Sequence, residues 1–88
     1  MAIEAFEIKV GQEKLDDLIR RLKNTNFPND FNNDDWGFGT NASYLRELRD
    51  YWLTQYDWRQ QEIRMNSYDH FKTIIDDVPI HFIHKKGI

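Results

Sequence analysis

The chain has 88 residues, with 12 basic and 15 acidic side chains and a formal net charge of −3. This length allows one domain, which buries only about 60–65% of the surface that its unfolded chain exposes, so such domains usually need disulfides, metals or partners. Cysteine is absent, which excludes disulfides and thiolate metal sites and fits a reducing compartment. The modest negative charge excludes the basic footprint of a nucleic-acid-binding protein.

The N-terminal segment, MAIEAFEIKV, contains no basic region followed by an apolar run, so no signal peptide is predicted. No apolar run approaches the roughly 20 residues that span a bilayer. We therefore expect a soluble, cytoplasmic protein with neither a membrane nor a nucleic acid as its partner. Aromatic residues make up 15% of the chain, which indicates either a dense core or a surface kept for a partner.

Two periodicities follow each other near the N-terminus. Residues 5–10 alternate between apolar and charged side chains, the pattern of a half-buried strand, which Gly11 ends. Residues 12–24 change to helical spacing, with acidic residues early and basic residues late, an order that complements the helix dipole. The apolar stripe of this helix consists of Leu15, Leu18, Ile19 and Leu22.

Residues 25–40 are rich in Asn, Asp, Gly and Pro and are predicted to form a loop. Four large aromatic residues interrupt this polar composition, namely Phe27, Phe31, Trp36 and Phe38. A solvated linker would not carry them, so we expect the loop to lie over an apolar surface. That surface belongs either to a neighbouring domain, on which the loop acts as a clamp, or to the chain's own core.

Two further helices are predicted, over residues 42–55 and 57–67. Thr40 or Asn41 is the expected N-cap of the first, and Asp57, with Gln60 three positions on, forms a capping-box pattern at the second. The helix predicted over residues 42–55 carries an apolar stripe that is more typical of a core than of a cofactor site. Its members are Tyr44, Leu45, Leu48, Tyr51 and Trp52.

Residues 70–84 alternate in two short runs and predict a β-hairpin. Asp76-Asp77 is the turn signal, weaker than Asp-Gly, and Pro79 confines the second strand's start to an edge or first position. Two strands alone are marginal in water, so this hairpin is interpreted as the start of a larger sheet. The fold class expected is α+β: a small helical domain of about three helices with an N-terminal strand and a C-terminal β-hairpin.

Five motifs occur in order along the chain, at Leu15–Leu22, Trp36–Thr40, Tyr44–Trp52, Tyr56–Glu62 and Ile80–His84. Together they resemble the N-terminal domain of microsomal-type epoxide hydrolases, and the resemblance covers nearly the whole chain. One departure is Asp77, where that family usually has Gly in the turn, which leaves the turn type open.

The resemblance implies that residues 1–88 are an epoxide-hydrolase N-terminal-like domain that straps across an α/β-hydrolase domain, and that residues 70–88 begin the sheet of that domain. It also implies that the catalytic aspartate, the histidine with its acidic partner, the two lid tyrosines and the His-Gly-Trp-Pro loop come later than this chain reaches. No catalytic residue, cofactor-binding residue or metal ligand is therefore expected here.

The side chains themselves offer little chemistry. His70, His81 and His84 raise the question of a metal site, but strand positions three apart face opposite sides, which favours sheet-surface or interface histidines. The adjacent carboxylates Asp34-Asp35 and Asp76-Asp77 are more typical of solvated turns than of an acid/base pair.

Three functions remain open after the sequence analysis. The first is a non-catalytic strap that supports the lid of an epoxide hydrolase, whose activity would open an epoxide to a vicinal diol and whose hydrolase domain would be the partner. The second is a freestanding protein-interaction or homodimerisation module, and the third is a binder of small apolar molecules. The residues predicted to form an interface are Phe31, Trp36, Phe38, Tyr44, Trp52, Trp58 and Phe82.

Overall fold

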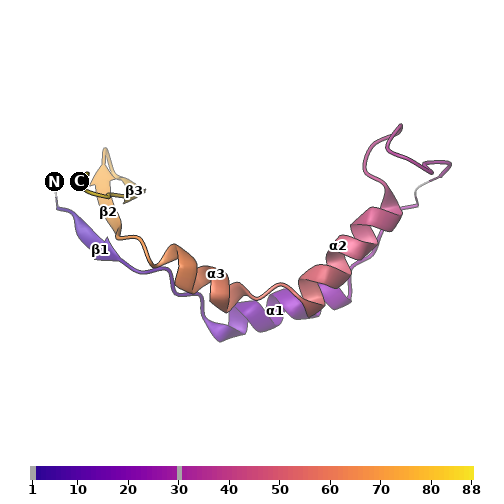
Figure 1. The fold of residues 1–88 in the computed structure, drawn as a ribbon, viewed down its shortest axis with the longest axis horizontal. Helices are drawn as coiled ribbons and strands as arrows, with labels where there is room; N and C mark the ends of the chain where they lie inside the picture. Colours follow the sequence, from indigo (N-terminus) through magenta and orange to yellow (C-terminus); the bar gives the residue numbers. More distant parts are fainter. Residues whose placement is uncertain (1, 30) are drawn as a thin grey trace. The chain divides into compact units, whose positions relative to one another are not determined.

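The computed structural model describes residues 2–29 and 31–88 and has the predicted α+β fold. Figure 1 traces its six elements in chain order. They are β1 (Glu4–Phe6), α1 (Gln12–Lys23), α2 (Ala42–Thr54), α3 (Trp58–Met65), β2 (His70–Ile75) and β3 (Val78–Ile83). The loop predicted over residues 25–40 contains neither helix nor strand where it is described.

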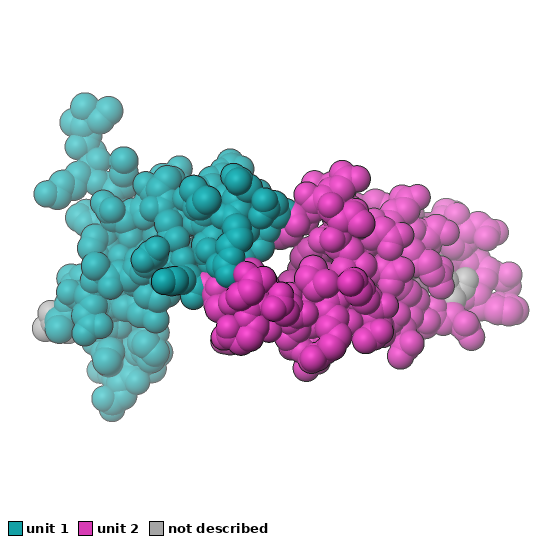
Figure 2. All heavy atoms as spheres, turned by 90° about the horizontal axis from the view of Figure 1, so that it is seen from below, with its two compact units in different colours: residues 1–9, 57–88 teal, residues 10–56 magenta. Residues whose placement is uncertain are grey.

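The chain divides into two compact units, which are coloured separately in Figure 2. Unit 1 joins the N-terminal residues up to Lys9 to the segment Asp57–Ile88, and unit 2 is the segment Val10–Tyr56. Unit 1 therefore holds the sheet and α3, whereas unit 2 holds α1, α2 and the loop between them.

The sheet of unit 1 has three antiparallel strands in the order β1-β2-β3. The predicted N-terminal strand, residues 5–10, is shorter than expected, because only Glu4–Phe6 pair with β2. Beyond β1 the backbone of Ile8 is held by a side chain instead of a strand. Asn66 accepts from the Ile8 N–H at 3.0 Å and donates to the Ile8 carbonyl at 2.7 Å, which satisfies both backbone groups.

The hairpin turn between β2 and β3 has two residues, Asp76 and Asp77, flanked by the pair Ile75 and Val78. Both have positive φ, 49° and 64°, which is the type I′ geometry that matches the twist of a hairpin. Aspartate tolerates this left-handed region better than most residues, although glycine adopts it without steric cost.

Replacing Asp77 by glycine is expected to stabilise the hairpin by about 0.5–1 kcal/mol, because the substitution removes the steric cost of a positive φ at the second turn position. Urea unfolding followed by circular dichroism measures the change. Lys85→Gly, outside the strands, is the control and should give no gain. A loss of stability in Asp77→Gly would contradict the assigned turn geometry.

In unit 2, α1 and α2 pack against each other, and side chains secure both helices. Asn41, rather than Thr40, is the N-cap of α2 and accepts from the Tyr44 N–H at 3.0 Å. Arg49 on α2 donates to the carbonyl of Leu22 at 3.4 Å, and its guanidinium carbon lies 5.1 Å from the ring centroid of Phe27. Phe27 thus packs within unit 2. For this residue, the structure agrees with the interpretation that the loop over residues 25–40 covers the chain's own core.

The apolar residues of this chain are not enclosed. No hydrophobic residue among those described is fully buried, and the buried ones are polar: Asn33, Glu62 and His70. The stripe of α1 is only half-buried. The chain therefore has the local structure of a domain without the enclosed apolar core that normally stabilises one.

Candidate docking surfaces

One face of the sheet is apolar from edge to edge. The strand register places the following side chains on it, which together we call the apolar sheet face: Ala5, Phe71, Thr73, Ile75, Val78, Ile80 and Phe82. Phe71 and Phe82 stack with their ring centroids 5.5 Å apart. The aliphatic members remain open, with Ile75, Val78 and Ile80 exposed to 47%, 53% and 39%. The helix of the same unit, α3, does not pack against this face.

The opposite face of the sheet is mixed and includes the two histidines of a cross-strand pair. His70 on β2 and His81 on β3 stack with centroids 5.1 Å apart, and their nitrogens Nδ1 and Nε2 lie 2.9 Å apart. Phe6 meets His81 edge-on at 5.4 Å, and the ammonium of Lys72 lies 4.0 Å above the Phe6 ring. Polar or charged residues thus alternate with apolar ones on this face, which also exposes Ile74 and Ile83, so it is less apolar than the apolar sheet face.

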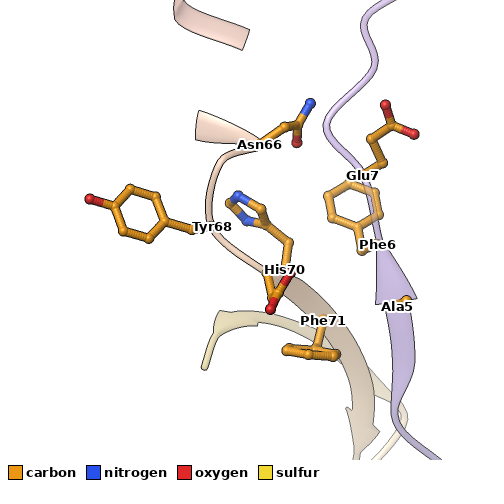
Figure 3. Close-up of a pocket in the computed structure, with 8 residues that line it drawn as sticks. Ala5, Phe6, Glu7, Asn66, Tyr68, His70 and Phe71 are labelled. Carbon is orange, nitrogen blue, oxygen red and sulfur yellow. The ribbon is translucent and has the colours of Figure 1, made fainter. Parts of the chain in front are cut away.

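A shallow hollow of about 370 Å³ lies between β1 and the turn that leads into β2. Figure 3 shows Asn66 at one end of it and Phe71 at the other, with His70 and Phe6 between them. His70 is only 5% exposed, and its Nε2 lies 2.6 Å from the carbonyl of Met65. Because a carbonyl only accepts, Nε2 of His70 carries a proton, and Nδ1 of His70 shares a hydrogen bond with Nε2 of His81 whose direction depends on the tautomer. Both ring nitrogens are thus engaged in structural bonds.

His84 lies beyond the end of β3, whereas His81 lies within the strand and contacts His70. Within residues 2–29 and 31–88, no three metal-binding side chains come together. The contact between His70 and His81 was missed in the sequence. It follows from the register, which pairs Lys72 with His81 and makes His70 a diagonal neighbour.

Unit 2 carries the second exposed apolar surface, on the loop of residues 31–41, which we call the aromatic loop. Its three large aromatic residues, Phe31, Trp36 and Phe38, are exposed to 86%, 56% and 82%. The Trp36 ring meets Tyr44 on α2 with centroids 5.4 Å apart. Within the described residues these side chains do not close the chain's own core, and the interpretation of the loop as a clamp stays a prediction.

The outer side of α2 continues this exposure. Of the predicted stripe only Leu45 is half-buried, together with Leu53, which lay outside the prediction. The other four members are exposed: Tyr44 to 50%, Leu48 to 46%, Tyr51 to 51% and Trp52 to 41%. The expectation that these four residues belong to a core is therefore wrong for the described chain. The helix has a second apolar side, which periodicity alone does not distinguish from the buried one.

The remaining predicted interface residues lie in unit 1 and are half-buried. Trp58 donates through Nε1 to Glu62 at 3.1 Å, and Glu62 also accepts from Arg59 at 2.8 Å. Phe82 lies on the apolar sheet face against Phe71. The seven predicted residues therefore fall into two groups, Phe82 and Trp58 in unit 1, and the other five on the aromatic loop and α2.

None of the helices within the described residues combines the length and the apolar character that crossing a bilayer requires.

Comparison with known proteins gives the family. The family model "Epoxide hydrolase N terminus" matches residues 3–87. Epoxide hydrolase 1 of Oryctolagus cuniculus is 35% identical over 97% of this chain but only 19% of its own length. The solved structures of the epoxide hydrolase of Aspergillus niger and the juvenile hormone epoxide hydrolase of Bombyx mori both match with TM-scores of 0.85, at 30% and 29% identity. The match covers 94% of this chain and 22% of the Aspergillus niger chain, and 93% of this chain and 20% of the Bombyx mori chain.

The chain thus spans about a fifth of the length of the relatives it matches, at identities close to one third and over nearly all of its own residues. The resemblance drawn from the five sequence motifs is confirmed. The chain belongs to the epoxide hydrolase N-terminal family.

Proposed function

We propose that this chain is the N-terminal part of an epoxide hydrolase and acts there as a strap that supports the α/β-hydrolase domain without supplying a catalytic group. The activity of the whole enzyme would be the hydrolysis of an epoxide to a vicinal diol. The main support is the apolar sheet face, which unit 1 itself does not cover. An exposed apolar layer of this kind is normally buried by a second layer of the same domain or by a partner.

The energetic argument favours a large, permanent contact. Burying apolar surface contributes about 25 cal/mol per Å², or about 1.5–3 kcal/mol for one fully buried aliphatic or aromatic side chain. Several such side chains are open on the apolar sheet face and on the aromatic loop. Their burial would supply the stability that a chain without an enclosed core lacks, and would couple its folding to the hydrolase domain.

The proposal is tested with a chimaera in which this chain replaces the matching segment of the Aspergillus niger epoxide hydrolase, which it resembles over 94% of its length. We expect the chimaera to be folded and to convert styrene oxide to its diol. The same enzyme without any N-terminal segment should give a yield of active protein at least about 100-fold lower than that of the chimaera. The isolated chain should give no diol. Equal activity with and without the segment, or turnover by the isolated chain, would reject the supporting role.

A freestanding homodimer is the second candidate, because the same apolar sheet face could be covered by a second copy. Light scattering after size exclusion separates the two. A chain that forms a stable dimer with cooperative unfolding supports the interaction module, whereas a weakly stable monomer that gains stability in the chimaera supports the strap.

A further inference from the structure

The aromatic loop is held together by side-chain amides at its base. Asn33 is 5% exposed and donates through Nδ2 to the carbonyls of Gly39 and Thr40, at 3.2 and 3.3 Å. Its Oδ1 accepts from the Phe38 N–H at 3.2 Å. One buried amide thus joins the start of the loop to its end.

A second amide extends this arrangement to the helix. Asn41 donates through Nδ2 to the carbonyls of Asn33 and Asp35, at 3.1 and 3.3 Å, while its Oδ1 caps α2 through the Tyr44 N–H. The loop also has its own tight turn, in which Gly39 donates to the carbonyl of Trp36 at 3.1 Å. Satisfied, partly buried networks of this kind favour one backbone conformation. We call Asn33 and Asn41 the amide clasp.

The clasp fixes the backbone at Phe38, and Phe31 lies two residues before Asn33 at the start of the loop. Phe31 and Phe38 are the two most exposed large side chains of the loop, at 86% and 82%. Because the two asparagines fix the backbone beneath the exposed Phe38, this part of the loop is preorganised, and binding through it costs less conformational entropy.

The charges of the loop indicate the chemistry of the surface that it binds. Residues 31–41 contain Asp34 and Asp35 and no Lys, Arg or His. An aromatic loop with two carboxylates and no cation complements an apolar recess with a basic rim. In the relatives, the matched segment makes up only 19–22% of the length, so about four fifths of each relative's chain lies outside it.

We propose that the aromatic loop is a preorganised anchor that inserts Phe31 and Phe38 into an apolar, basic-rimmed recess of the hydrolase domain, and that Asn33 is the positioning residue that holds it in the docking conformation. This inference rests on the proposed strap function. It adds that the aromatic loop of unit 2 makes the contact, that the surface receiving the loop is apolar with a basic rim, and that the contact depends on the buried Asn33.

The clasp itself is tested on the isolated chain by hydrogen exchange. Asn33→Ala is expected to speed exchange of the Phe38 amide at least about tenfold, because that N–H loses its acceptor. The control is Asn32→Gly, an exposed neighbour whose φ of 57° glycine also adopts, and it should leave the exchange rate unchanged. Equal exchange in Asn33→Ala and the unmodified chain would overturn the positioning role.

Docking is tested in the chimaera by its half-life at a temperature where it slowly inactivates. Phe31→Ser and Phe38→Ser are each expected to shorten it roughly tenfold, the loss expected when one anchored aromatic side chain is removed. Asp34→Lys should shorten it at low salt, with the difference shrinking at high salt. Ile63→Ser, on the exposed side of α3 at 66%, is the matched control and should change little.

A double-mutant cycle separates positioning from a merely structural role. If Asn33 acts through the docked loop, Asn33→Ala costs little once Phe38→Ser has removed the anchor, so the two effects in the chimaera fall well short of additive. Additive effects would overturn the positioning role. If the chimaera is active and both phenylalanine variants have unchanged half-lives, the proposal that the loop is an anchor is overturned, whereas the proposed strap function stands. If the chimaera itself is inactive, the strap function is rejected.

The chimaera's mass by light scattering identifies the occupant. A monomer, or an oligomer that Phe38→Ser does not dissociate, supports the hydrolase domain as the partner of the loop. Dissociation of a dimer by Phe38→Ser would overturn that assignment in favour of a second copy of this chain.

Discussion

Replacing Ile80 by aspartate is expected to leave the isolated chain nearly as stable as before, but to reduce the yield of active chimaera at least about 100-fold. Ile80 lies on the apolar sheet face and is 39% exposed, so in the isolated chain the new carboxylate reaches water. In the assembled enzyme the same carboxylate would be buried without a partner. Losing the burial of isoleucine and desolvating a charge together cost about 3 kcal/mol or more, which corresponds to the expected 100-fold loss.

The matched control is Ile83→Asp, the same substitution in the same strand. Ile83 is 52% exposed and lies on the opposite face, with His70, Lys72 and His81. Because that face is mixed and carries charged and polar neighbours, a new carboxylate there keeps polar surroundings, and we expect less than about a tenfold loss in the chimaera. Active enzyme is measured by diol formation per milligram of soluble protein. Equal losses in the two variants would contradict the assignment of the apolar sheet face as the one that is covered.

Replacing His70 by alanine is expected to lower the free energy of unfolding by about 2–4 kcal/mol. His70 is 5% exposed, stacks on His81 and uses both ring nitrogens, so its removal leaves the Met65 carbonyl and His81 without their partner and opens a cavity beneath the sheet. Total stabilities of single domains are only about 5–15 kcal/mol, so this one substitution removes a large share. Urea unfolding of the isolated chain, repeated as thermal unfolding of the chimaera, measures the loss.

His84→Ala is the control for this experiment. The His84 side chain is exposed beyond β3, so its removal should change stability by less than about 0.5 kcal/mol. A His70→Ala variant as stable as the His84→Ala variant would show that the histidine pair is incidental to unit 1.

The elements whose signals are local were predictable from the sequence. The three helices follow from apolar residues at helical spacing, and α2 and α3 also from capping side chains. Asp57, for example, accepts from the Gln60 N–H at 3.3 Å. The hairpin follows from alternation and a two-residue turn signal. Asp77 adopts the positive φ that a type I′ turn requires, so the two-residue turn forms without a glycine at this position.

The features that depend on distant partners were not predictable in this way. β1 ends early because the side-chain amide of Asn66, and not a neighbouring strand, bonds the N–H and the carbonyl of Ile8. The buried state of Asn33 depends on backbone carbonyls six and seven positions away in an irregular loop, for which no periodic signal exists. The side of α2 that packs on α1 depends on Arg49 reaching Leu22, whereas apolar character alone pointed to the exposed side.

The bonds between Ile8 and Asn66 join residues 58 positions apart in sequence, and β1 pairs only with β2. During synthesis, residues 4–6 therefore leave the ribosome long before the strand that orders them has been made. Closing a loop of this length costs entropy before any contact compensates for it, and such non-local pairing slows folding. β1 is thus translated before β2 but ordered only after it, and until then its place on β2 is open to a strand from another molecule.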